Sequence, residues 1–314
     1  MTRVARWGRM RWRSRSALLA VTISTLLAFA TVATSQTAVT PVSFTPEETK
    51  VLLDKVKAGL IRDRQLEAQY TYLEKRRDVK VSGLGKVSLG EARTFEVYPS
   101  VEPGRTYKRL IAINDKPLPP AELATRDAAH RQRLEDEARK RSAETPEQTR
   151  IREARTKARI ARQRREVEDA FNSYTYQVEG RESLEGHPRP LLRVKMTPNQ
   201  AYRATTNNDF VKYAKKFTGV AWVDEQDGQV VRIRAEATDG VNIGLGIVGR
   251  VNKGSVATFE RRKVNGEVWL PWRAKLDVTG RAAIFRRFDF ETETTWWDYK
   301  KFSVETDVVG VRRQ

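Results

Sequence analysis

Three acidic residues at alternate positions are the side chains in this sequence best placed to do chemistry together. Asp289, Glu291 and Glu293 would all lie on one face of a strand. Neighbouring carboxylates in such a ladder stand roughly 6.6 Å apart, a separation that acid–base hydrolysis or a calcium site could use. Arg286 and Arg287 lie close by in the sequence, and cross-strand charge pairing is the simpler role. We therefore expect no catalytic centre on this strand.

A glycine fingerprint, Gly244-Leu-Gly246-Ile-Val-Gly249, matches the GxGxxG pattern of dinucleotide-binding loops. That site requires the glycines to follow a buried parallel strand and to open a helix whose amino end meets the pyrophosphate. Here Arg250 to Gly254 and another strand pattern follow, and no helix pattern does. The segment is better interpreted as an apolar loop, either a hairpin tip or a lip over a hydrophobic cavity.

Histidine and cysteine chemistry is poorly represented. His130 lies in a charged helical pattern and His187 beside a proline, and neither belongs to a recognisable hydrolase arrangement. Two isolated histidines also make poor metal-site material. The chain has no cysteine to ligate a metal, attack a substrate, form a disulfide or carry a lipid. We predict a protein with no enzymatic activity, no metal and no cofactor.

The region 217–304 reads as one amphipathic strand after another. Apolar residues at every second position define one face, and charged residues define the other. An antiparallel sheet with one solvated side produces this alternation. Asp227-Gly228 and Asn265-Gly266 are typical hairpin turns between such strands. The inward apolar positions, which we expect to line a cavity, are Val231, Ile233, Leu270, Trp272, Phe288 and Phe290.

A helix is expected before the first strands. Thr45 can cap it, with Pro46 at the first helical position and Glu48 completing a capping box. Leu52, Val56 and Leu60 follow at helical spacing and should face the sheet. Strands are then expected from Leu66 onward, and further strands at 87–98, 106–113, 174–178 and 192–196.

Residues 121–171 form a segment of different character, rich in charge and without glycine. We predict two helices broken at Pro146, because the residue before a proline disfavours helix. The segment from Gln148 to Arg165 contains eight basic residues and one acidic residue. Helices this polar should be mobile or project from the body. The basic side chains are either a solvated surface or a contact for anionic lipid or an acidic partner, and include Arg155, Arg159, Arg162 and Arg165.

The net charge is +19, from 59 Lys plus Arg against 40 Asp plus Glu. Such a surface suits nucleic acid, anionic lipid or acidic polymers. The amino terminus favours the last two, because a run of arginines, an apolar stretch from Ala17 to Ala33 and a small-x-small pattern predict a signal peptide over residues 1–35. The alternative is an uncleaved inner-membrane anchor. We expect an exported, periplasmic protein and no nucleic-acid partner.

The predicted fold class is mainly β, a curved antiparallel sheet or half-open β-barrel with an amino-terminal helix and a charged helical insertion. The expected order is a signal peptide (1–35), the helix and first strands (36–120), the insertion (121–171) and the remaining strands of the same domain (172–310).

Three segments of the carboxyl-terminal half resemble a known family. They are Phe217-Thr-Gly-Val-Ala-Trp222-Val-Asp224, Gly228-Gln-Val-Val-Arg232-Ile233 and Gly266-Glu-Val-Trp269-Leu-Pro271. The run from about 170 to 306 resembles the outer-membrane lipoprotein-sorting (LolA/LolB-like) envelope proteins. The resemblance implies a strongly curved antiparallel sheet with helices as a lid, and a cavity that holds an acyl chain. The motifs describe hairpins, so no functional residue is carried over.

Two functions follow as expectations. The first is an exported envelope protein that binds or carries a lipid or lipoprotein acyl chain in the curved sheet. The alternative is a non-enzymatic envelope scaffold or sensor that contacts a partner protein through the basic insertion.

Overall fold

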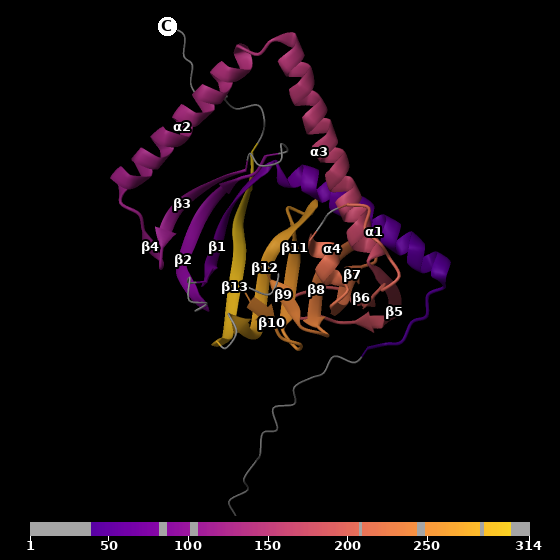
Figure 1. Ribbon diagram of the computed structural model, residues 1–314. Helices are drawn as coiled ribbons and strands as arrows, with labels where there is room; N and C mark the ends of the chain where they lie inside the picture. The colour runs from indigo at the N-terminus through magenta and orange to yellow at the C-terminus, as the bar shows by residue number, and fades with distance from the viewer. Residues whose placement is uncertain are drawn as a thin grey trace, which may run out of the picture. The chain divides into compact units, whose positions relative to one another are not determined.

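The computed structural model describes residues 39–81, 87–100, 106–206, 209–243, 249–282 and 286–302. It confirms the predicted fold class: the strands form one open, antiparallel 13-stranded sheet accompanied by helices (Figure 1). The predicted signal peptide, 1–35, lies outside the described residues. Within them, no helix combines the length and the apolar character needed to cross a membrane.

The strands form two series that meet in the middle of the sheet. The spatial order is β4-β3-β2-β1-β13-β12-β11-β8-β7-β6-β5, with β9 and β10 attached beside β12. The first series comprises β1 (Tyr70–Val81), β2 (Val87–Tyr98), β3 (Tyr107–Ile113) and β4 (Lys116–Pro117). The second comprises β5 (Tyr174–Glu182), β6 (Leu191–Pro198), β7 (Phe217–Asp224), β8 (Gln229–Ala237), β9 (Val241–Ile243), β10 (Gly249–Val251), β11 (Val256–Val264), β12 (Val268–Ala282) and β13 (Arg286–Lys301).

The charged insertion connects the two edges of this sheet. Helix α2 (Pro120–Ser142) follows edge strand β4, and helix α3 (Pro146–Asn172) leads into the opposite edge strand, β5. The break at Pro146 is therefore confirmed. The eleven strands from edge to edge, β4 to β5, would span about 48 Å in a flat sheet with about 4.8 Å between strands. Helices α2 and α3 are about 34 and 40 Å long. The insertion is thus the crossover that the strand order requires.

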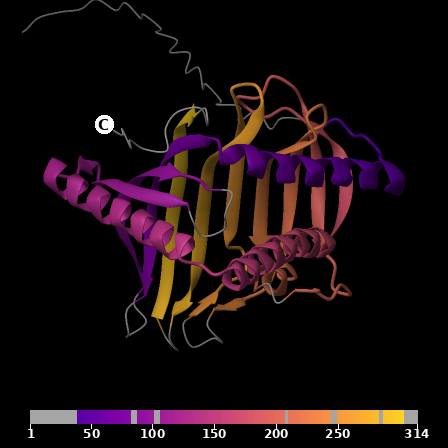
Figure 2. The same cartoon turned by 90° about the horizontal axis from the view of Figure 1, so that it is seen from above.

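Helix α1 (Pro46–Glu67) has the predicted capping box. Thr45 Oγ1 accepts a hydrogen bond from the Glu48 amide at 3.2 Å, and the Thr45 amide donates to Glu48 Oε2 at 2.7 Å. The helix runs through Leu66, where we expected strand, because its last turn continues the same apolar face and packs beside Tyr70. Figure 2 shows α1 crossing over the strands.

The sheet has two distinct faces, which the strand register defines. Val194, Ala221 and Ile233 are cross-strand neighbours on the inner face, the one that α1 covers. Trp222 and Arg232 pair on the outer face. The main core lies between α1 and the inner face, with Leu52 and Val56 of the helix buried against the sheet.

Both predicted hairpin turns are present. Gly228, with φ of 63°, ends the turn from β7 to β8, and Asn265 and Gly266, with φ of 50° and 70°, form the turn from β11 to β12. These left-handed conformations favour glycine and asparagine.

The glycine fingerprint opens no helix. Gly244 and Gly246 lie outside the described residues, whereas Gly249 begins β10 and pairs with Ile243 of β9. A strand therefore follows where a dinucleotide site requires a helix.

Candidate functional site: an apolar cavity beneath helix α1

A cavity of about 180 Å³ lies between α1, the end of α3 and the inner face of the sheet. Its lining is apolar apart from one guanidinium and the tyrosine hydroxyls. The lining residues are Leu52, Leu53, Val56, Leu60, Ala170, Phe171, Tyr174, Tyr176, Val194, Met196, Ala221, Val223, Val230, Ile233, Phe259 and Arg261.

Each wall follows from a local sequence pattern. Leu52, Val56 and Leu60 repeat every four residues, so they share the face of α1 that looks onto the strands. The floor comes from alternate positions on neighbouring strands, such as Val194 and Ala221. The α3 wall is fixed at its end, where the Tyr176 hydroxyl donates to the Phe171 carbonyl at 3.0 Å.

Arg261 supplies the one charged part of the wall. It is 7 % exposed, and its Nη2 donates to Asp63 Oδ2 of α1 at 2.8 Å and to the Trp269 carbonyl. Nη1 donates to Gln229 Oε1 at 3.0 Å. Burial lowers the pKa of the Arg261 guanidinium, and the adjacent Asp63 carboxylate opposes that shift. The pair fastens α1 to β11 and balances the buried charge.

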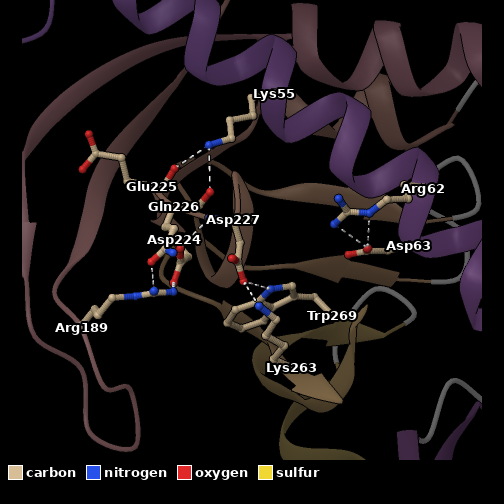
Figure 3. A network of polar contacts seen from close by, with 10 residues as sticks. All are labelled: Lys55, Arg62, Asp63, Arg189, Asp224, Glu225, Gln226, Asp227, Lys263 and Trp269. Atoms are coloured by element: carbon tan, nitrogen blue, oxygen red, sulfur yellow. Dashed lines mark hydrogen bonds and ion pairs between the residues drawn. The ribbon is translucent and has the colours of Figure 1, made fainter. Parts of the chain in front are cut away.

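A second anchor holds the other end of the α1 face. Lys55 Nζ donates to the carbonyls of Glu225 and Gln226 at 2.8 and 3.0 Å, in the turn between β7 and β8 (Figure 3). Lys55 and Asp63 are about 12 Å apart along the helix axis. The helix is thus fixed at two points, one within the segment Leu52–Leu60 that covers the cavity and one just beyond it.

The turn between β7 and β8, which Lys55 contacts, is itself held by ion pairs and a hydrogen bond (Figure 3). Arg189 Nη2 lies 2.7 Å from Asp224 Oδ2, and Asp227 Oδ2 lies 2.7 Å from Lys263 Nζ and 2.9 Å from Trp269 Nε1. Burial alone would raise the pKa of Asp227, but the contacts with Lys263 and Trp269 outweigh burial and lower it. This carboxylate is therefore a fixed structural acceptor.

One of the six predicted cavity residues, Ile233, lines this cavity. Val231 packs on the outer face with Trp222 and Trp269, and Val230 lines the cavity instead. The expectation that Val231 and Ile233 share a face is wrong because of a β-bulge. The register shifts where Trp222 and Val223 face Arg232 and Val230, and this reverses the alternation.

A bulge also separates Leu270 from Trp272, at the point where β12 passes Glu260 and Arg261. Leu270 is buried in a separate cluster with Tyr70, outside the cavity. Trp272 is 37 % exposed, with the Arg273 guanidinium 4.8 Å from its ring centroid.

Phe288 and Phe290 lie near the start of β13, and their rings stack with centroids 5.8 Å apart. The register places Phe290 opposite Val278, on the same face as Ala274 and Phe259. They therefore lie on the inner face, but outside the cavity lining.

The other predicted chemistry is dispersed. Glu291 pairs across strands with Lys275 at 3.1 Å, the role expected of the acidic ladder. The ring of His130 stacks on that of Tyr107 with centroids 3.5 Å apart, and the ring centroids of His187 and Trp269 are 6.4 Å apart. Nowhere in the described ranges do three or more His, Asp or Glu side chains gather as a metal site would require.

The predicted basic contact residues do not act as one group. Arg155 and Arg159 line a groove where α2 meets α3. Arg162 instead pairs with Glu166 on the same helix at 2.9 Å, and Arg165 is exposed outside that groove.

Sequence reasoning missed the buried pair of Asp63 and Arg261. A signal was available, because Asp63 continues the spacing of Leu52, Val56 and Gly59 along the buried face of α1. A carboxylate on such a face requires a cationic partner. Nothing in the sequence identified that partner among the arginines of β11.

Comparisons with protein families, with curated proteins and with solved structures found no match to this chain. The fold and the site define an open antiparallel sheet with an apolar cavity roofed by a doubly anchored helix.

Proposed function

We propose that this protein binds a hydrophobic ligand, an acyl chain of a lipid or lipoprotein, with the end of the chain in the cavity beneath α1. The observation that carries the proposal is the apolar lining of a space of about 180 Å³. Apolar cavities of about 150 Å³ in proteins stay dry and admit benzene-sized guests. A terminal segment of an acyl chain suits the same chemistry.

The inner face offers a path for the rest of the chain. Phe259 lies in the cavity wall and pairs with Ala274, from which the face continues to Leu276, Val278 and Phe290. Leu276 is 39 % exposed, so apolar surface along β12 remains uncovered. From Ala274 to Val278 this path is about 14 Å long.

The charge balance at Arg261 favours a neutral chain inside the cavity. Its guanidinium is already paired with Asp63, so an ionised ligand group placed there would be buried without a free counter-charge. The polar end of the ligand therefore belongs outside, toward the open end of the inner face. The predicted export and the lipoprotein-sorting resemblance fit such a ligand.

A fluorescent apolar probe tests the proposal on the delipidated full chain. We expect low-micromolar binding that a long-chain fatty acid displaces. Ile233→Trp should fill the cavity and weaken probe binding at least tenfold. Arg234→Trp adds the same side chain to an exposed position on the same strand and should leave binding unchanged. Absence of probe uptake, or equal loss in both variants, would contradict the proposal.

A further inference from the structure

The surface formed by α2 and α3 is charged and largely uncovered. No residue of α2 is buried, and Asp169 is the one buried residue of α3. The hairpin is fastened near its two ends: Arg109 of β3 bonds Asp127 at 2.8 and 2.7 Å, and Phe171 packs against the core. Figure 1 shows the two helices meeting at an elbow that stands away from the strands.

The positive charge of α3 is mostly unbalanced. Of its basic residues, Arg152 pairs with Glu144 and Arg162 with Glu166. Six others have no ion-pair partner in the described part of the chain: Arg150, Arg155, Lys157, Arg159, Arg164 and Arg165. Like charges at i and i+4, such as Arg155 and Arg159, destabilise a helix in water. An external anionic surface would turn this repulsion into attraction.

The elbow itself forms a basic groove of about 900 Å³. Its single carboxylate, Glu144, has its pKa lowered chiefly by the hydrogen bond from Arg152, so it stays ionised and neutralises that arginine. Lys140, Arg155 and Arg159 are left to face the groove without a counter-charge among the described residues. Guanidinium and ammonium groups that converge in this way suit phosphate oxygens.

Exposed aliphatic side chains accompany these charges. Leu134 of α2 is 50 % exposed, and Ile151 and Ile160 of α3 are 42 % and 41 % exposed. Arginine-rich helices that also expose aliphatic residues are typical of proteins that lie in the interface of an anionic bilayer. An acidic protein partner would account for the charges and leave the aliphatic residues unexplained.

We propose that the α2–α3 elbow docks on an anionic phospholipid surface, with Lys140, Arg155 and Arg159 contacting lipid phosphates and Ile151 entering the interface. Arg159 and Phe171 are about 18 Å apart along the α3 axis. A docked elbow therefore holds the cavity that Phe171 lines close to the lipid from which a chain would come. The docking itself does not depend on the cavity being occupied.

Vesicle sedimentation of the full chain tests the proposal. We expect binding to vesicles of equal phosphatidylglycerol and phosphatidylcholine, little binding to pure phosphatidylcholine, and release as salt shortens the Debye length. The triple variant Lys140→Gln, Arg155→Gln and Arg159→Gln should partition roughly a hundredfold more weakly. Glutamine keeps the helix propensity close to that of lysine and arginine, and circular dichroism checks that the helices persist.

A matched control removes the same charge from the strands and one of their turns, with Lys195→Gln, Lys253→Gln and Arg281→Gln, all at exposed positions. Binding of this control variant to the anionic vesicles should weaken by no more than about fivefold. Equal loss in both triple variants, or equal binding to neutral vesicles, would overturn the proposal. Binding to polyglutamate through the same arginines, without binding to anionic vesicles, would overturn it in favour of an acidic protein partner. Because no arm measures the cavity, the result is separate from that of the probe experiment.

Discussion

Helices α1 and α3 begin with the same local signal and lie in opposite environments. Thr45 and Glu48 form a capping box at the start of α1, and Thr145 and Gln148 form one at the start of α3. Both helices then repeat small or apolar residues at intervals of three and four. In α1 these residues, from Leu52 to Gly59, are buried. In α3 they are all exposed, and they are Ile151, Ala154, Ala158 and Ala161.

The difference lies in side-chain volume and in specific anchors. Leucine and valine bury enough apolar area to hold α1 on the sheet, whereas the alanines of α3 contribute little. Helix α1 also has Lys55 bonded to the turn between β7 and β8 and Asp63 bonded to β11, while the middle of α3 carries unbalanced arginines. Capping and spacing therefore specify that a helix forms, and volume and anchors decide whether it is covered.

The largest effect should come from the buried anchor of α1. Arg261→Met leaves Asp63 buried without its main partner and should lower the free energy of unfolding by about 3–5 kcal/mol. Urea denaturation measures this change. Arg62→Met removes the exposed cation 3.3 Å from the same carboxylate and should cost at most about 1 kcal/mol. The double variant Asp63→Leu and Arg261→Met should recover much of the loss, and equal effects of the two single variants would refute the role of burial.

Truncation at matched positions tests the contrast directly. Leu52→Ala should lower the free energy of unfolding by about 2–3 kcal/mol, toward the low end for buried leucine because the site already borders a cavity. Ile151→Ala in α3 should change it by no more than about 0.5 kcal/mol. Thermal and urea unfolding measure both. Similar losses at the two positions would show that α3 is covered in solution.

The carboxyl end of α3 should be sensitive to acid. Burial alone would raise the pKa of Asp169, but hydrogen bonds from Thr206, Thr205 and Tyr202 outweigh burial and place it well below its usual range. Because folding lowers this pKa, the stabilisation is present above the unfolded value of about 3.9 and is lost as the pH falls through the folded value.

Asp169→Asn should therefore flatten the acid side of the stability profile and cost about 1–3 kcal/mol at neutral pH. Urea midpoints measured across that pH range give the result. An unchanged profile would mean that these hydrogen bonds do not distinguish the folded state.

The smallest global effect is expected at the α2 end of the hairpin. Asp127→Asn removes the carboxylate that Arg109 grips and should speed amide hydrogen exchange along α2 while the urea midpoint of the whole chain stays unchanged. Asp136→Asn, which affects only exposed contacts with Arg139 and Gln132 within α2, is the matched control. Equal exchange in the two variants would mean that other contacts hold α2.

Much of the secondary structure could be predicted from the sequence, because it rests on local patterns. Strand β2 occupies the expected residues 87–98, and the capping signals and Pro146 located the starts of α1 and α3. The strand order could not be predicted, since neither composition nor period indicates that β13 pairs with β1. The sequence therefore predicted a projecting insertion, but not that this insertion links the two edges of the sheet.

The candidate site was harder to predict because it depends on two single-residue irregularities. Strict alternation groups Val231 with Ile233 and Leu270 with Trp272, and one bulge in each strand separates them. Bulges depend on the register of neighbouring strands, which a single sequence does not contain. Trp269 shows the same limit: it alternates with the predicted inward residue Leu270, and it is nevertheless buried with Leu184 and Leu191.

The pairing of β1 with β13 has a consequence for how the chain folds. Tyr70 lies opposite Lys301, so this ladder joins residues more than two hundred positions apart, whereas β1 to β4 and β5 to β8 each form as hairpins between neighbours. Loop closure over such a distance is slow relative to local hairpins. During synthesis, strand β1 therefore keeps an unpaired edge until β13 emerges and pairs with β1 and β12.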